Sequence, residues 1–500
     1  MKKLFIICVL TISNYVLAQS ATNLKVSESA EYKDKVKSDE VIAIYTSDSG
    51  KTAIVRSSKR NFLFDIFDVK LKKTDSKDVK IDRKEKHVGD LFYNNQLKLF
   101  TVYAPKKDER ILYCHTLNLD SKAYTKTVVF KTNVEKKQSL FGSRKNHNTS
   151  FSLSPNGNYF AIATDNIRKN KNSYTIRVFD AKTEKLIFKK AYQEGVKRVF
   201  EHNDLYVDND ANVYSLGKLF IKGRGEKKGG KANYQFILNK ITKIKNTPLK
   251  LNLKKIHIKS LSISNINNEL HLIGFYSELN VGRIKGGCNF LIDTDNFSVK
   301  TKKSEDLPKQ VYEDLYGYRT AQRKNKKKKE LFNFDIDYVL KNSNGDTYLI
   351  AEEFYVTQHY VHSAGPMMTG GHTQRVYHYD DILILKFNSD GDLAWGRSVF
   401  KRANSPSYNV FLKNDQLHVI LNSGKNLTKK NDGRTKVSKG WFESSSLYDI
   451  EYAVNGDVSY NKIQNNKGNA YYYPYYGTYK SNKFIMMSSG KRKKTFMILE

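Results

Sequence analysis

Short apolar segments separated by turns rich in Asn, Asp and Gly recur along most of the chain. The clearest copy spans residues 344–402 and reads NGDTYLIAEEFYV, then a Gly- and His-rich loop, then YDDILILKFNSDGDLAWGRSVFKR. Alternation of apolar and polar residues predicts half-buried strands, and the Asp-Gly pairs predict tight turns between them. Because one such unit cannot bury its own apolar face, the units must stack on one another.

Eight units with this order can be traced, and they start near residues 41, 91, 151, 205, 261, 344, 408 and 477. The last unit stops one strand short at Glu500, and the segment Asn23–Ser27 can supply the missing strand. A closed ring has no exposed sheet edge. The pattern therefore predicts an all-β fold, a single β-propeller of seven or eight mostly antiparallel four-stranded blades over residues 19–500, closed by an N-terminal strand.

Four stretches interrupt the pattern and are expected to be insertions, near residues 222–231, 305–330, 363–371 and 427–441. The second ends in a run of basic residues, and such runs usually form solvated loops. We therefore expect a loop there and very little helix anywhere.

The N-terminus has the pattern of a secretory signal peptide. Two lysines precede an apolar run from Leu4 to Leu17, and Ala18 follows it. This order predicts cleavage after Ala18, so the mature protein is expected to be secreted or periplasmic. No later apolar run approaches the roughly 20 residues that a membrane-spanning helix needs. We expect a monomer without a transmembrane segment.

The chain is strongly basic, with 86 Lys and Arg against 51 Asp and Glu and a formal charge of +35. Loss of Lys2 and Lys3 with the leader lowers the charge to +33. A surplus of this size attracts polyanions, and the exposed candidates for contact are Lys326, Lys327, Lys328 and Lys329. Lys far outnumbers Arg, however, whereas proteins that read nucleic acids rely on the planar Arg side chain. A general bias of the composition toward Lys explains the charge better than a polyanion-binding surface does. No specific nucleic-acid partner is expected.

Potential metal ligands gather only around the loop at residues 363–371. A hairpin there would place His362 and His372 across from each other, and His359 and His378 lie nearby as possible ligand contacts. Two ligands make a weak site, so we expect no metal and no cofactor. Cys114 and Cys288 could form one disulfide in an oxidising compartment, but both lie in apolar strands, where a free thiol packs as a small hydrophobic group.

Signs of catalysis are weak. The chain contains no G-x-S-x-G nucleophile motif. The pairs Glu352/Glu353 and Asp380/Asp381 are adjacent in predicted strands, where neighbours point to opposite faces and do not share acid–base work. Tyr472, Tyr473 and Tyr475 precede the last unit and are either ligand contacts or packing between blades.

The segment from Asn344 to Asn426 resembles uncharacterised secreted β-propeller proteins of the Bacteroidetes. The resemblance rests on YDDILILKFNSDGDLAWGRSVFKR and the following LHVILNSGKN. It implies a propeller fold and export, and it implies no activity or site residues.

These observations favour a binding or scaffolding module at the cell envelope, whose partner is a protein or a glycan. Propellers mount variable loops on a rigid ring, so the ligand is expected at the channel or on one face. Two alternatives stay open: a polysaccharide hydrolase or lyase acting at the channel mouth, and a basic surface protein that binds polyanions.

Overall fold

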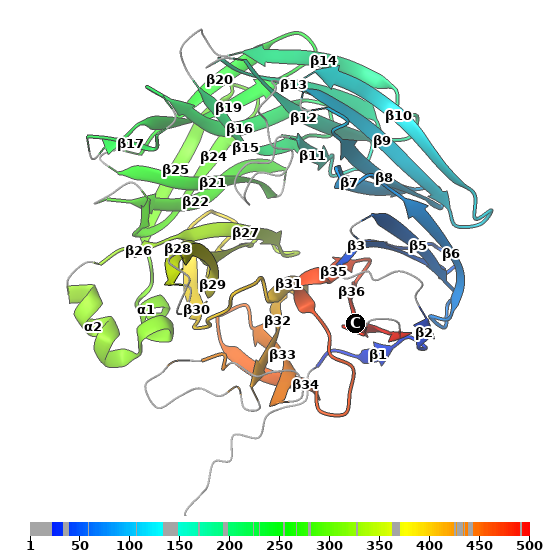
Figure 1. Ribbon diagram of the computed structural model, residues 1–500. Coiled ribbons are helices and arrows are strands. Elements are labelled where there is room, and N and C mark those ends of the chain that lie inside the picture. Colours follow the sequence, from blue (N-terminus) through cyan, green and yellow to red (C-terminus); the bar gives the residue numbers. More distant parts are fainter. Residues whose placement is uncertain are drawn as a thin grey trace, which may run out of the picture.

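The expected repeat units fold as sheets of four antiparallel strands, and eight such sheets form a ring in the computed structural model of the chain (Figure 1). The structure describes residues 23–500 except 34–39, 59, 107, 134–148, 169–170, 194–198, 224, 230, 254–255, 267, 279–281, 327–328, 363–370, 425–426, 428–433, 435, 439–443 and 491–492. The side chains of residues 165–173, 192–198, 325–328 and 359–374 are also outside the description. The fold is a β-propeller, as predicted, with eight blades.

The first four blades follow one another along the chain, each running from the channel outwards. Blade 1 consists of β3 (Glu40–Thr46), β4 (Thr52–Ser57), β5 (Asn61–Phe67) and β6 (Lys73–Lys80). Blade 2 consists of β7 (Glu85–Tyr93), β8 (Gln96–Tyr103), β9 (Glu109–Asn118) and β10 (Tyr124–Asn133). Blade 3 consists of β11 (Thr149–Leu153), β12 (Tyr159–Arg168), β13 (Lys171–Asp180) and β14 (Leu186–Gln193). Blade 4 consists of β15 (Phe200–Val207), β16 (Val213–Phe220), β19 (Tyr234–Ile241) and β20 (Asn246–Leu251).

The next three blades keep the same order. Blade 5 consists of β21 (His257–Ile266), β22 (Glu269–Ser277), β24 (Gly286–Asp293) and β25 (Ser298–Asp306). Blade 6 consists of β27 (Phe334–Lys341), β28 (Thr347–His362), β29 (Gly371–Phe387) and β30 (Leu393–Val399). Blade 7 consists of β31 (Tyr408–Lys413), β32 (Gln416–Gly424), β33 (Ser445–Tyr452) and β34 (Val458–Asn465).

Blade 8 joins the two ends of the chain. Its inner strands are β35 (Thr478–Lys480), β36 (Lys483–Met487) and β38 (Phe496–Leu499), and its outer strand is β1 (Val26–Glu28). Val26 pairs with Leu499 and Glu28 with Met497, so the blue and red ends of the ribbon meet in one sheet (Figure 1). The predicted closure by an N-terminal strand is confirmed. It gives the last sheet its fourth strand, so β38 is paired on both sides.

Three two-stranded ribbons supplement the blades. They pair β2 (Tyr32–Lys33) with β37 (Lys493–Lys494), β17 (Lys227–Lys228) with β18 (Lys231–Ala232), and β23 (Arg283–Ile284) with β26 (Leu331–Phe332). The second ribbon lies in the predicted insertion near residues 222–231.

Turn residues explain the sharp corners between β7 and β8 and between β31 and β32. Asn94 and Asn95 have φ of 47° and 55°, and Asn414 and Asp415 have φ of 49° and 62°. Consecutive positive φ values define the tight hairpin turns that match the twist of the strands, and Asn and Asp tolerate that backbone best.

Apolar side chains fill the spaces between neighbouring blades. All eight residues of β16 and of β33 are buried, because blades cover both faces of these strands. Phe64 of blade 1 and Leu97 of blade 2 belong to one buried apolar cluster, and Phe67 of blade 1 packs edge to face on Phe496 of blade 8. Cys114 and Cys288 are buried in this core, as predicted, and both are free thiols.

The prediction of a loop near residues 305–330 is wrong, because this insertion forms two helices on the outside of the ring (Figure 1). They are α1 (Lys309–Tyr316) and α2 (Tyr318–Lys326). Val311, Leu315 and Ala321 are fully buried in the core shared with blades 5 and 6. The many basic residues in this segment masked the short apolar face in the sequence pattern. That face contributes to the packing of the ring.

Candidate functional site

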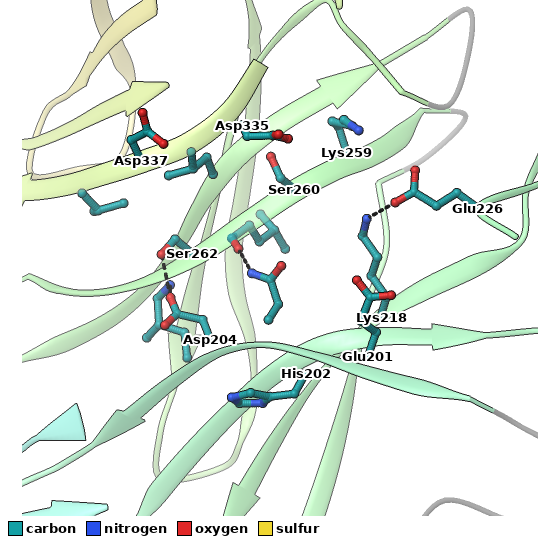
Figure 2. A pocket seen from close by; sticks show the side chains of 15 residues that line it. Glu201, His202, Asp204, Lys218, Glu226, Lys259, Ser260, Ser262, Asp335 and Asp337 are labelled. Atoms are coloured by element: carbon teal, nitrogen blue, oxygen red, sulfur yellow. Dashed lines mark hydrogen bonds and ion pairs between the residues drawn. The ribbon is translucent and has the colours of Figure 1, made fainter. Parts of the chain in front are cut away.

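The innermost strands of the blades surround a central channel. A cavity of about 590 Å³ lies on one side of it and is lined mainly by β15, β21 and β27 from blades 4, 5 and 6. Figure 2 shows the carboxylates of Asp335 and Asp337 on one side of this cavity and those of Glu201 and Asp204 on the other. We call it the acidic cavity.

The charge of this lining is opposite to that of the whole protein. Five carboxylate residues line the acidic cavity against two lysines, whereas the chain has 51 acidic and 86 basic residues. The five are Glu201, Asp204, Glu226, Asp335 and Asp337, and the lysines are Lys218 and Lys259. Carboxylates that face one another across a cavity produce a negative potential there, which favours a ligand with positive charge.

Asp204 and Glu226 are held by neighbouring groups in the cavity wall. Asp204 accepts hydrogen bonds from the Ser262 hydroxyl at 2.6 Å and from the backbone N–H of Ile263 and Leu205 at 2.8 Å. Desolvation in the wall raises the pKa of Asp204. Glu226 pairs with Lys218 at 2.7 Å (Figure 2). Asp204 therefore fastens blade 4 to blade 5.

The remaining three carboxylates are partly exposed along the cavity. Glu201 lies on β15, and Asp335 and Asp337 lie on β27. Asp337 also accepts a hydrogen bond from the Tyr408 hydroxyl of blade 7 at 2.9 Å. These positions can offer hydrogen-bond acceptors and negative charge to a ligand in the channel.

A second cavity of about 590 Å³ is lined by β3, β27, β31 and the turn before β35, so it shares β27 with the acidic cavity. It contains Glu40, His87 and Lys341 together with several aromatic rings. Burial raises the pKa of Glu40. The first cavity is therefore acidic, whereas the second has a mixed lining.

A groove at the rim brings together some of the predicted tyrosines. It has a volume of about 320 Å³ and is lined by the connection 401–407 and by Tyr471, Tyr473, Tyr475 and Tyr476. Tyr472 does not line it: the ring is fully buried, and its hydroxyl donates to Glu28 at 2.8 Å. Of the three tyrosines singled out in the sequence, Tyr473 and Tyr475 thus lie at a surface site and Tyr472 is part of the core.

A cluster of carboxylates lies beside this groove, around Arg402. The guanidinium is 2.7 Å from Asp381 and 3.6 Å from both Glu353 and Asp380. Burial and the neighbouring Asp381 raise the pKa of Glu353 to about 7. Burial also raises the pKa of Asp381 to about 6, although Arg402 opposes the shift.

The alternation rule does not hold at this cluster. Asp380 and Asp381 were expected on opposite faces, yet both contact Arg402. A β-bulge between β28 and β29 is the reason: Glu352 pairs with Ile382 and Phe354 with Tyr379, so Glu353, Asp380 and Asp381 fall between regular pairs. Sequence periodicity gave no signal for this bulge.

The histidine-rich hairpin has a different register from the predicted one. His362 pairs with Gly371 and His372 with Val361, so the two histidines do not occupy opposed positions. Their side chains and that of His359, which pairs with Gln374, lie outside the described residues. His378 stacks on Tyr355 with ring centroids 4.4 Å apart and hydrogen-bonds to Thr357 at 2.9 Å, so it packs within the hairpin.

Of the four lysines expected to contact polyanions, only Lys329 has a described side chain. Lys329 is exposed, whereas Lys327, Lys328 and the side chain of Lys326 lie outside the described residues. Polyanion contact there stays a prediction.

A cluster that could hold a metal lies inside blade 7, where the sequence gave no indication of one. Potential ligand atoms of His418, Asp449 and Glu451 lie within 4.8 Å of one another. His418 hydrogen-bonds to Asp449 at 3.0 Å, and Asn461 donates to Glu451 at 3.1 Å. The residues come together only because β32 and β33 pair, with His418 opposite Glu451. Their mutual hydrogen bonds give these buried groups partners without an ion.

Comparisons with known proteins show likeness in fold alone. No protein-family model and no curated protein matches the chain. The propeller of Dos1 is similar over 94% of this chain and 95% of its own, with 8% identity and a TM-score of 0.44. The β-propeller domain of the Trilobed protease from Pyrococcus furiosus is similar over 86% of this chain and 99% of its own, with 8% identity and a TM-score of 0.38. The assignment to the β-propellers rests on the ring of eight blades itself.

Helices in the described part of the chain are short. None of them has the length and apolar character needed to cross a membrane.

Proposed function

We propose that the protein is an exported binding module whose acidic cavity receives a positively charged segment of a protein partner. The observation that carries this proposal is the excess of carboxylates in the acidic cavity of a chain with 35 surplus positive charges. The leader-like residues 1–18 support export.

The acidic cavity has the features of a specific site. Its wall is made of strands from three blades, and the hydrogen bonds that Asp204 accepts from blade 5 fix two of those blades together. Side chains on such a frame are held in place before a ligand arrives, which lowers the entropic cost of binding. A Lys or Arg side chain that enters the cavity would meet Glu201, Asp335 and Asp337.

Because the protein as a whole is basic, binding of a cationic peptide is a stringent test for the acidic cavity. At long range a basic protein repels a cationic peptide, so binding requires a local site that overcomes this repulsion. The mature protein from residue 19 is titrated into fluorescein-labelled hexa-arginine at low salt, and fluorescence anisotropy is measured. We expect saturable binding with a stoichiometry of one.

Matched variants then locate the site. The double variant Asp335→Asn and Asp337→Asn removes two charges from the acidic cavity, and the expected effect is at least a tenfold increase in Kd. The control Asp295→Asn and Asp390→Asn removes two charges from exposed turns of blades 5 and 6 and is expected to change Kd less than twofold. Equal losses in both variants, or no saturable binding by the unmodified protein, would contradict the proposal.

A further inference from the structure

The groove at the rim has a lining unlike that of the acidic cavity. Besides its four tyrosines it presents neutral polar side chains, which are Asn404, Ser405, Ser407, Asn422 and Ser438. No carboxylate residue is among the described residues that line it. We call this site the aromatic groove.

The tyrosines stand on a turn that is fixed from several directions. The Asn409 amide donates hydrogen bonds to the carbonyl oxygens of Pro474 at 3.1 Å, Tyr475 at 3.4 Å and Gly477 at 2.8 Å. The Asn422 amide donates to the Tyr472 carbonyl at 3.0 Å. Because the turn is anchored in this way, its rings are positioned before any ligand binds.

The rings contact one another edge to face. Tyr471 and Tyr473 have centroids 5.2 Å apart at 75°, and Tyr475 and Tyr476 have centroids 5.1 Å apart at 72°. Tyr473 and Tyr476 continue the series at 6.1 Å and 80°. In this arrangement the faces are not stacked on each other, and Tyr473 is 36% exposed. Aromatic faces with hydroxyl tips are therefore presented at the surface.

The positive charges at the aromatic groove are compensated. Lys401 is buried and pairs with Glu352 at 2.8 Å. Arg402 is surrounded by Glu353, Asp380 and Asp381 at the distances given above. The groove thus has little net positive charge to offer a polyanion, in contrast to the chain as a whole.

From this combination we infer that the aromatic groove binds a neutral carbohydrate chain. A pyranose ring has C–H groups that pack on an aromatic face, and hydroxyl groups that exchange hydrogen bonds with amides and hydroxyls. The four tyrosines and the five neutral polar residues supply both kinds of contact. Tyr475 and Tyr476 line the second channel cavity as well as the groove, so a longer chain can extend from the rim toward the channel.

Affinity electrophoresis tests this inference directly. The mature protein is run in native gels that contain xylan, glucomannan, mixed-linkage β-glucan or dextran, and positive results are quantified by calorimetry with the matching hexasaccharide. We expect retardation by at least one of these neutral polysaccharides, and Tyr473→Ala and Tyr475→Ala should each weaken hexasaccharide binding at least tenfold.

Two controls separate this inference from the proposed function. Tyr318→Ala removes a tyrosine of similar exposure, 42%, from α2, and it should leave retardation unchanged. The double variant Asp335→Asn and Asp337→Asn should also retain carbohydrate binding, because the acidic cavity is a different site. No retardation by any of the four polysaccharides would overturn the inference. Loss of hexa-arginine binding in Tyr473→Ala without any carbohydrate binding would instead assign the groove to the peptide.

Discussion

The acidic cavity and the aromatic groove are built from different parts of the same ring. The acidic cavity is lined by strands β15, β21 and β27, whereas the groove is lined by the connection 401–407 and by the turn before β35. One collects negative charge in the channel and the other collects uncharged polar and aromatic groups at the rim. The comparison shows that one repetitive frame can carry two sites of different chemistry, since strands fix the first and turns form the second.

The largest effect is expected where the aromatic groove meets the core. Tyr472→Ala removes a fully buried ring together with its hydrogen bond to Glu28, and it should lower the free energy of unfolding by about 3–5 kcal/mol. Tyr473→Ala, at the neighbouring surface position, should cost less than about 0.5 kcal/mol. Urea denaturation of both variants measures the difference, and similar losses would mean that the groove is part of the core.

A smaller loss is expected from the wall of the acidic cavity. Asp204→Asn replaces an acceptor oxygen by an amide that faces N–H or O–H donors from Leu205, Ile263 and Ser262. Leaving such a donor without an acceptor costs about 1–3 kcal/mol. The same measurement on Asp335→Asn, which lies on the open side of the cavity, should show a smaller change. A stable Asp204→Asn protein would refute the structural role of this carboxylate.

The rigidity of the aromatic groove can be tested separately. Asn409→Ala removes the amide that donates to three carbonyl groups of the tyrosine turn, and we expect it to cost about 1 kcal/mol. Hexasaccharide binding should weaken because the rings are less well positioned, while hexa-arginine binding at the acidic cavity should be unchanged. Weakening of both would show that the two sites are not independent.

The last test concerns pH and the carboxylates beside the groove. The pKa of Glu353 is raised from its ordinary value of 4.5 to about 7, so the folded protein holds this proton more tightly than the unfolded chain does. The resulting stabilisation is fully present below pH 4.5 and is lost as the pH rises through about 7. Glu353→Gln should flatten this decline in thermal unfolding between pH 5 and 8. The exposed control Glu269→Gln should retain the slope, and an unchanged slope in Glu353→Gln would show that other groups control it.

The strand pattern and the turn chemistry determine the architecture of this protein. Alternating segments with Asn and Asp turns place the eight blades, because side-chain periodicity and positive φ are local properties. The closing strand could be predicted as well, since a repeat that lacks one strand needs another segment of the chain to complete its sheet. Tyr473 and Tyr475 are indicated by residue type and by their position before the last unit, and these two criteria do not separate them from Tyr472.

Only the tertiary structure decided which residues share a site. Glu201 and Asp335 are far apart in the sequence and line one cavity because blades 4 to 6 are neighbours in the ring. The bulge at Glu353 places both Asp380 and Asp381 against the guanidinium of Arg402, an arrangement that strict alternation of side chains along a strand excludes. The helices at residues 309–326 pack against blades 5 and 6 through a few apolar residues within a basic segment. Contacts of this kind depend on ring geometry and long-range packing, and local sequence patterns do not encode them.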